Sequence, residues 1–425
     1  DSIDNSGTIS GGTNSINIDA TSTATINNSG VLDGDVYLGT TGNVLNINGN
    51  SARIIGNVSN AGASSTVNIN GTFTSEGTFN VGDFNVNSGG LLNMNHDITA
   101  TTTTVNSGGT LNVGTGTRNV TGNYVQAGAY SMGLTDASTY GNLNVSGTAT
   151  LNTGSTVNLS LNGTPGATIN GVIVSTGLSG TAIGAQGDQS GVVVNDNSAL
   201  YNFSASNARA VNELDLIVAK DDQALAGAST VAGPATVGVS GALNDMFVNG
   251  IPAGMQPLFD ALGTMTEEEL AVALQQLTPA MQGAGSQAGL NALHSMNKII
   301  QSRIVSNQGL SSGDATSERY AWARIFGNWG DQDTHKGVSG FESDTYGMVF
   351  GADKPFTDKI RAGGAFTYAK TDIDSSGGAE RSNVNVDTFE IVGYGSYNID
   401  PVTDINVQLD MGLNKADSTR RSMLG

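Results

Sequence analysis

A nearly literal repeat limits the folds open to this chain more than any other feature. The segment Asn87–Met94 (NSGGLLNM) returns 19 positions later as Asn106–Val113 (NSGGTLNV). Shorter words of the same kind, such as Ile16–Ile18 and Leu45–Ile47, precede it and are separated by turns rich in glycine and asparagine. A period near twenty residues, made of short strands and tight turns, is typical of a solenoid. The sequence therefore predicts a parallel β-helix over residues 1–121, with aliphatic side chains turned inward and Gly or Asn at corners that need a positive φ.

The composition favours β-structure over disorder and limits the partners. The chain holds 59 glycines and only 13% charged residues, whereas disordered segments usually carry high charge and few β-branched residues. Val, Ile and Thr instead recur in short runs, as strands require. The net charge is −20 and the first part has no basic patch, so nucleic acid and anionic membrane surfaces are not expected as partners. Cysteine is absent, which is compatible with export.

The sequence pattern changes at Gly122, and the new, non-repeating pattern runs to residue 222. Its characteristic segments are Tyr140–Leu161 and Asn212–Lys220. The end of a β-helix exposes unpaired strand edges and apolar core, so a cap is physically required there. The predicted core of this cap consists of the aliphatic residues Leu143, Val145, Leu151, Val157, Leu159 and Leu161.

Residues 223–318 combine a predicted linker with predicted helices. Gln223–Asp245 is small and flexible in composition and is interpreted as a linker. Thr266–Glu269 forms a capping box, with Met265 and Leu270 placed as a hydrophobic staple. A second helix is expected over about 286–306, and some twenty residues would span about 30 Å. Its predicted faces are mixed: apolar Leu290, Leu293, Ile300 and Ile304 against polar His294, Asn297, Lys298, Gln301 and Arg303.

Residues 319–425 are predicted to be strands. In Arg319–Asp331 (RYAWARIFGNWGD), large side chains alternate with mostly smaller ones, which is the period of a strand. Rings at strand ends are also what a membrane barrel places at the lipid–water interface. Five strands are expected, near 320–329, 344–352, 359–370, 384–397 and 403–414. The large residues of the first are Tyr320, Trp322, Arg324 and Phe326.

The last of these strands alternates most cleanly. Apolar side chains occupy one face, and Asp404, Asn406, Gln408 and Asp410 occupy the other. In a barrel these faces would meet lipid and lumen; in a soluble sheet they would meet core and water. The apolar set is Ile405, Val407, Leu409, Met411 and Leu413.

The segment Arg319–Asp331 resembles the opening strand of an autotransporter β-domain, the outer-membrane barrel of type V secretion proteins. Residues 122–220 resemble the autochaperone region of the same family. The resemblance implies an all-β fold: a right-handed parallel β-helix passenger, a short α-helical linker with a helix inside the pore, and a truncated antiparallel transmembrane β-barrel. Family barrels have twelve strands, and the chain opens at Asp1 without a signal peptide, so we expect a fragment at both ends. Some members are cut between paired asparagines in the pore helix, and no such pair occurs here.

The resemblance also implies a location and partners. The barrel would lie in the outer membrane, with lipid and the barrel-assembly machinery as partners, and the passenger would be at the cell surface or released. We expect an adhesin or surface scaffold, with a host-cell or matrix ligand, and no enzyme. The alternative is the stem of a secreted protease or esterase whose catalytic domain lies upstream. A soluble β-helix enzyme acting on polysaccharides is the third reading, which the strands after Arg319 disfavour.

Residues with chemical potential are few. His96 is interpreted as a corner residue, and Asp331–His335 as a solvated turn. Asp33 and Asp35 could form an acid–base pair, but a turn explains them more simply. Gly283–Ala288 matches a loose dinucleotide pattern but does not follow a strand. The sequence therefore predicts no catalytic, metal-binding or cofactor-binding residue and no cofactor.

Overall fold

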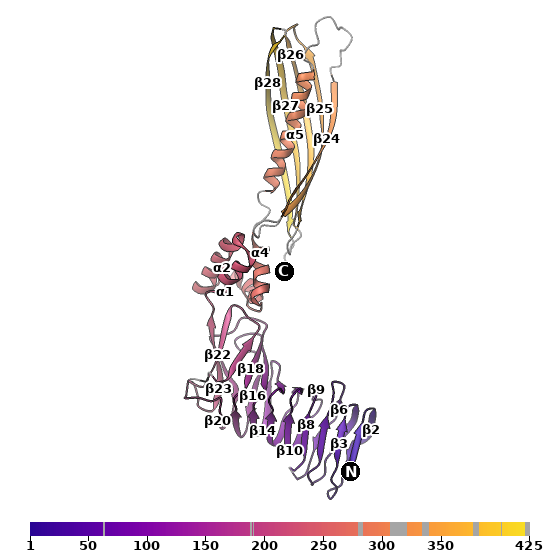
Figure 1. Ribbon diagram of the computed structural model, residues 1–425, viewed down its shortest axis with the longest axis vertical. Helices are drawn as coiled ribbons and strands as arrows, with labels where there is room; N and C mark the ends of the chain where they lie inside the picture. The colour runs from indigo at the N-terminus through magenta and orange to yellow at the C-terminus, as the bar shows by residue number, and fades with distance from the viewer. Residues whose placement is uncertain are drawn as a thin grey trace. The chain divides into compact units, whose positions relative to one another are not determined.

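The fold is taken from a computed structural model of the chain (Figure 1). The structure describes residues 1–62, 64–187, 189, 191–278, 284–306, 321–333, 340–376, 382–400 and 402–420. The chain divides into two compact units. Unit 1 comprises Asp1–Ala224 with Asn244–Leu270, and unit 2 comprises Leu225–Leu243 with Ala271–Gly425.

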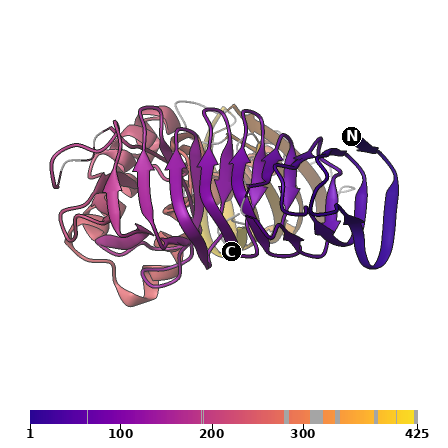
Figure 2. The same cartoon turned by 90° about the horizontal axis from the view of Figure 1, so that it is seen from below.

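Unit 1 is built on a parallel β-solenoid, seen in Figure 2 as a row of arrows stacked side by side. The 19-residue repeat is one coil, because Leu92 pairs in register with Leu111 in the next coil. The glycines Gly89 and Gly108 of the two repeats have φ of 81° and 79°, as the corners require. The strands of the repeating coils are β1 (Ser2–Asn5), β2 (Thr8–Asn17), β3 (Thr25–Asn28), β4 (Val31–Tyr37), β5 (Val44–Ile47), β6 (Arg53–Ile55), β7 (Val58–Ser59), β8 (Thr66–Ile69), β9 (Thr72–Thr74), β10 (Phe79–Val86), β11 (Leu91–Asn93), β12 (Ile98–Val105) and β13 (Thr110–Asn112).

The solenoid separates apolar from polar residues by strand alternation. Leu45, Ile47, Val67 and Ile69 are fully buried inside the coils. The residues between them point outward, and Asn27, Asn46, Asn68 and Asn85 lie above one another in register. Their amides are joined by hydrogen bonds of 2.8, 3.0 and 3.1 Å. We call these four residues the first asparagine row.

The parallel coils continue past residue 122, so the change in sequence pattern there does not mark a change of fold. Tyr130 of β15 pairs in parallel with Val157 of β18. The antiparallel end comes later, where β23 pairs with β19 and β22. The strands of this part are β14 (Thr117–Gln126), β15 (Ala129–Leu134), β16 (Asn142–Val145), β17 (Thr148–Leu151), β18 (Thr156–Leu161), β19 (Thr168–Val174), β20 (Gly177–Ser179), β21 (Val193–Asp196), β22 (Tyr201–Ser206) and β23 (Glu213–Lys220).

The predicted linker is helical, so that prediction is wrong for Gln223–Asp245. Alanine, valine and leucine there form helices that bury Leu225 and Ala228. Later residues of this region pack in unit 1, where Phe247 contacts Tyr201 and Phe259. The helices are α1 (Ala224–Ala232), η1 (Pro234–Thr236), α2 (Val237–Asn249), η2 (Ala253–Met255), α3 (Gln256–Leu262), α4 (Glu267–Leu277) and α5 (Ala284–Ser306).

The two helix predictions after residue 265, the capping box at Thr266–Glu269 and the helix over about 286–306, are confirmed. The Thr266 amide donates to the Glu269 carboxylate at 3.0 Å, and the Glu269 amide donates to the Thr266 hydroxyl at 3.3 Å. These two bonds are the capping box that begins α4. The second predicted helix is α5, which starts two residues before the expected position.

The remaining part of unit 2 is an antiparallel sheet in the chain order β24-β25-β26-β27-β28. The five predicted strands are confirmed, and each is longer than expected. Their added ends are mostly polar, as at Asp372–Ser375 and Lys415–Thr419, and therefore carry little of the apolar alternation that marks a strand in the sequence. The strands are β24 (Ala321–Gln332), β25 (Gly340–Pro355), β26 (Ile360–Ser376), β27 (Ser382–Asp400) and β28 (Thr403–Arg420).

Candidate functional site

The sheet of unit 2 has one exposed apolar face. Ile325, Met348 and Tyr368 are neighbours across three strands, and the same cross-strand line continues to Phe389 and Leu413. The aliphatic side chains of this face are exposed: Ile325 is 83% exposed, and Leu409 of the last strand is 78% exposed. We define the apolar face as Ile325, Met348, Phe350, Phe366, Phe389, Ile391, Val407, Leu409, Met411 and Leu413.

Helix α5 covers the opposite face, along which it runs in Figure 1. Its buried residues recur at every fourth position, which places them on one stripe of the helix. They pack against inward side chains such as Val349, Ala369 and Val392. We call this side of the sheet the helix face. The helix stripe consists of Ala288, Ala292, Met296, Ile300 and Ile304, with Ile299 beside it.

A buried carboxylate ties α5 to two strands. The Asp353 side chain on β25 is fully buried. Arg303 of α5 donates to it through Nε at 2.9 Å, and Arg361 of β26 donates through Nε at 2.6 Å. The Tyr394 hydroxyl donates to the same carboxylate at 2.9 Å and accepts from the Trp322 indole nitrogen at 2.8 Å. Two cations and a hydroxyl satisfy this buried charge, which would otherwise be costly.

Further along the helix face, polar groups line a small cavity of about 230 Å³. The Gln408 side chain donates to the side-chain oxygen of Asn297 on α5 and also to the Asp410 carboxylate at 2.8 Å. Glu390 accepts from the Thr367 hydroxyl at 3.2 Å. The sheet therefore holds the helix by polar contacts at two levels, near Asp353 and near Gln408.

The large side chains of β24 point to the other face of the sheet than the sequence suggested. Trp322 and Phe326 turn toward α5 and pack there, so their rings do not form an interface girdle on the apolar face. Arg324 donates to the Ser302 hydroxyl of α5 at 3.2 Å. Small and aliphatic residues, Ala323 and Ile325, point outward instead. Tyr320 lies outside the described residues.

The structure brings only two of the predicted polar helix residues onto the sheet. Asn297 and Arg303 make the contacts above, while His294, Lys298 and Gln301 are exposed in the described part of the chain. Leu290, assigned to the apolar side, is 58% exposed. The sequence interpretation missed the small residues Ala288 and Ala292, although their fourfold spacing with Met296, Ile300 and Ile304 was the available signal.

Asp353, Arg361 and Tyr394 were also missed. They lie on three different strands and meet only through the register of the sheet, so no local pattern marks them. The predicted cap residues, by contrast, are all buried in the solenoid core: Leu143, Val145, Leu151, Val157, Leu159 and Leu161. They belong to the parallel strands β16, β17 and β18.

The described residues lack two other features that would mark a functional site. No helix there is both long and apolar enough to cross a membrane, a result that does not address crossing by strands. No group of three or more histidine, aspartate or glutamate residues there is arranged to hold a metal ion.

Comparison with known proteins gives a family match and distant relatives. Residues 321–425 match the model of the autotransporter β-domain. An extracellular serine protease of Serratia marcescens is 28% identical over 142 residues, which are 33% of this chain and 13% of that protein. Outer membrane protein B of Rickettsia prowazekii is 32% identical over 88 residues, 20% of this chain and 5% of that protein. The matched stretches thus span a small part of these relatives, and no solved structure matches.

The match assigns the two faces of the sheet. In an outer-membrane barrel the exposed apolar face contacts lipid, and the helix face is the lumen. The protein thus lies in the outer membrane with its passenger exposed at the surface. With a β-solenoid followed by helices and the start of an autotransporter β-domain, this chain is a type V autotransporter.

Proposed function

We propose that the β-domain carries the solenoid across the outer membrane and then holds it at the surface, where it acts as an adhesin or scaffold. The observation that supports this most is the position of α5, which precedes the first strand and packs along the lumenal face. A chain that leaves the barrel through its pore must pass through the lumen. A helix tied there by Asp353 would keep the passenger attached.

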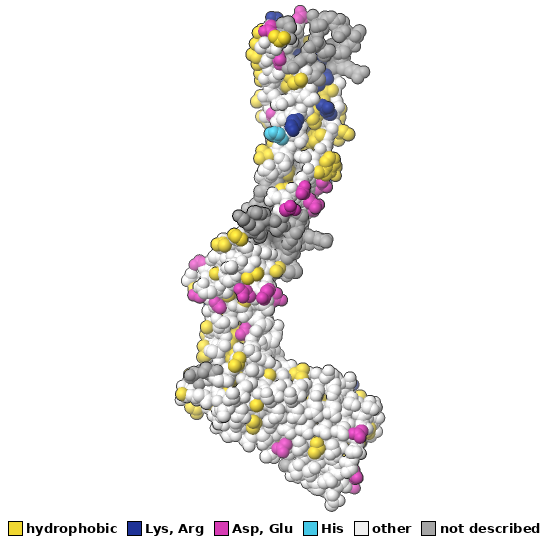
Figure 3. Space-filling view, in the orientation of Figure 1, with side chains coloured by type: hydrophobic (Ala, Val, Ile, Leu, Met, Phe, Trp, Pro, Cys, Tyr) yellow, Lys and Arg dark blue, Asp and Glu magenta, His cyan; other side chains and the backbone are white. Residues whose placement is uncertain are grey.

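The solenoid suits display in its surface chemistry. Its outward positions are largely asparagine, serine and threonine, and Figure 3 shows few charged or hydrophobic side chains on the visible face of the solenoid. Its amides bond to one another in the first asparagine row. Such a surface is well hydrated and offers little exposed apolar area for non-specific association. Outer-membrane lipid and the barrel-assembly machinery are partners of the β-domain, and a host-cell or matrix molecule is the proposed partner of the passenger. We propose no catalytic step for this chain.

The proposal predicts that Asp353→Asn loosens the helix in the pore. Breaking one side of a buried ion pair typically costs about 3–5 kcal/mol, since the remaining charges lose their partner. Cells that carry this variant should become more permeable to large antibiotics that the outer membrane normally excludes. Lys298→Ala, on the exposed side of the same helix, is the matched control and should leave permeability unchanged. Equal permeability of the Asp353→Asn and wild-type proteins, at equal barrel levels, would contradict the role given to α5.

A second candidate is the stem of a secreted hydrolase whose catalytic domain lies upstream. The relative named an extracellular serine protease supports it. The test is labelling of the secreted product of the complete reading frame with a fluorophosphonate probe, which reacts with active serine hydrolases. Labelling would favour the hydrolase stem, and surface display without labelling would favour the adhesin or scaffold.

A further inference from the structure

A break in a row of polar side chains marks an open groove on the solenoid. Residues Asn93, Asn112, Ser131, Asn158 and Asn195 lie in register on the consecutive strands β11, β13, β15, β18 and β21. We call them the second asparagine row. The Asn112 amide donates to Asn93 at 2.9 Å, and the Asn195 amide donates to Asn158 at 2.9 Å. Ser131 stands at the centre of the row, and its side chain is too short to join these two pairs.

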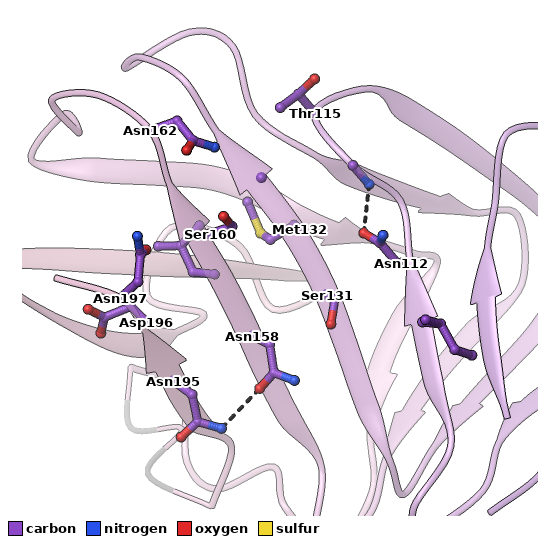
Figure 4. Close-up of a pocket in the computed structure, with 14 residues that line it drawn as sticks. Asn112, Thr115, Ser131, Met132, Asn158, Ser160, Asn162, Asn195, Asp196 and Asn197 are labelled. Carbon is purple, nitrogen blue, oxygen red and sulfur yellow. Dashed lines mark hydrogen bonds between the residues drawn. The ribbon is translucent and has the colours of Figure 1, made fainter. Parts of the chain in front are cut away.

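The first asparagine row shows what an unbroken row looks like. There each amide bonds to the next across every step from Asn27 to Asn85. In the second row, no hydrogen bond joins Ser131 to Asn112 or Asn158 among the described residues. The side-chain oxygen of Asn112 instead accepts a hydrogen bond from the Gly114 backbone amide at 3.1 Å. Figure 4 shows Ser131 between the two asparagines and the separate bonds on either side.

The break lies within a cavity of about 710 Å³, which the row lines from Asn112 to Asn195. That volume falls within the range of about 300–1,000 Å³ found for small-molecule sites. Three strand spacings of about 4.8 Å make the groove about 14 Å long across the sheet. The side chains of Met132 and Leu159 reach its lining and are otherwise buried.

The chemistry of the lining selects one class of ligand. Amides and hydroxyls both donate and accept hydrogen bonds, which matches sugar hydroxyls that do the same. The described residues of the lining include no lysine, arginine or histidine, and they carry the carboxylate of Asp196. An anionic ligand would therefore lack the charged donors that bind anions strongly and would meet a like charge. None of the lining residues that the structure describes has an aromatic ring on which a flat ligand could stack.

We propose that this groove binds a neutral oligosaccharide laid across strands β13 to β21. The Ser131 hydroxyl and the amide nitrogen of Asn158, which have no partner among the described residues, donate to its hydroxyl oxygens. This inference names the ligand class of the proposed adhesive role, and it rests on surface display of the passenger.

The test restores an amide at position 131, where the second asparagine row is interrupted. Ser131→Asn gives the row the amide that the first asparagine row has at every step, so it should bond to Asn112 and Asn158 and remove the free donors. Thr104→Asn is the matched control, because Thr104 follows Asn85 in register and extends the first asparagine row away from the groove. Asn158→Ala is a second variant that removes the donor without adding bulk.

Cells that express the complete reading frame are incubated with fluorescent neutral hexasaccharides of glucose, mannose, galactose and N-acetylglucosamine. A galacturonate hexamer is the anionic comparison. Antibody staining of the passenger measures display on the same cells. Loss of display in wild-type cells would refute the proposed function itself, whereas normal display concerns the groove alone.

With normal display, wild-type and Thr104→Asn cells should bind at least one neutral probe and bind the galacturonate probe poorly. Ser131→Asn and Asn158→Ala should bind that neutral probe about tenfold less, as expected when a ligand loses one or two hydrogen bonds. Unchanged binding by Ser131→Asn, preference for the anionic probe, or no binding of any neutral probe would each overturn the inference.

Discussion

The solenoid and the β-domain sheet both alternate apolar and polar side chains along their strands, but they expose opposite faces. In the solenoid, aliphatic side chains such as Ile47 and Ile69 point into the coils, and asparagines point to water. In the β-domain sheet, one whole face of large apolar residues, such as Ile391 and Met411, is exposed. The side that is packed against α5 combines apolar residues such as Val349 with buried polar and charged ones, including Glu390 and Asp353. Strand patterning thus specifies two faces, and the surrounding solvent decides which face is the outside.

The largest expected effect comes from truncating the solenoid core. Leu161→Ala and Ile47→Ala each remove most of a fully buried side chain, and each should lower the free energy of unfolding by about 2–5 kcal/mol. Urea titration of the passenger measures this cost. The cap prediction adds that Leu161→Ala should also reduce surface display, because the C-terminal end of the solenoid would fold first and template the coils.

Ile47→Ala should reduce display much less, at unchanged barrel levels. If the two variants reduce surface display alike, the end of the solenoid has no special part in secretion.

The next effect concerns the lipid-facing side of the sheet. Met411→Arg places a charge on the apolar face, and near the bilayer midplane this should destabilise the barrel by about 2–4 kcal/mol. Asn414→Arg lies on the same strand but on the opposite face and should cost less than about 1 kcal/mol, because lumenal positions are polar. Heat-modifiable migration of the β-domain on gels, compared across temperatures, measures both. Equal losses would mean that the two faces do not meet different solvents.

How far the sequence predicts this molecule depends on whether the signal is local. The 19-residue repeat predicts the coils because each coil repeats one local pattern, and the alternation of Ile405–Leu413 predicts the faces of β28. The capping box of Thr266 and Glu269 is equally local. The Asp353 cluster could not be predicted, since Arg303, Arg361 and Tyr394 reach it from three separate elements.

Misplaced residues have a similar cause. Trp322 and Phe326 are typical interface residues by type, but their alternation alone does not say which side faces lipid. The Gln223–Asp245 stretch looks like a linker by composition, yet it forms helices that bury Leu225, Ala228 and Ala232. In both cases tertiary contacts decide what the local pattern leaves open.

A smaller effect should come from the polar exterior of the solenoid. Asn68→Ala removes two links of the first asparagine row, to Asn46 at 3.0 Å and to Asn85 at 3.1 Å. Net contributions of about 0.5–1.5 kcal/mol per hydrogen bond suggest a cost of about 1–3 kcal/mol for the two bonds, with a midpoint below that of a core truncation. The same urea titration compares Asn68→Ala with Ile69→Ala, its buried neighbour. A greater loss of unfolding free energy in Asn68→Ala than in Ile69→Ala would mean that the first asparagine row stabilises the solenoid more than its core does.

The smallest effect is a pH dependence at the solenoid surface. The hydrogen bond from Arg53 lowers the pKa of the Glu76 carboxyl. Because the folded-state pKa lies below the unfolded one, the pair stabilises the fold above the unfolded value, near 4.5. That contribution is lost as the pH falls through the lower, folded-state pKa.

Unfolding curves measured from pH 6 down to acid should therefore show a small loss in the wild type that Glu76→Gln lacks. Identical acid dependence of the two proteins would show that this pair contributes nothing measurable.

The most direct measurement is where Asn297 of α5 lies in the assembled barrel. The chain has no native cysteine, so Asn297→Cys can be combined with Gln408→Cys on the helix face or with Val407→Cys on the apolar face. A short bis-maleimide reagent suits the pair better than a disulfide. Two residues joined by a hydrogen bond between their side chains have Cα atoms farther apart than a disulfide can bridge. In intact outer membranes, residue 297 should crosslink to residue 408 and not to residue 407. Crosslinking to residue 407 instead, or to neither residue in a folded barrel, would contradict a lumenal helix.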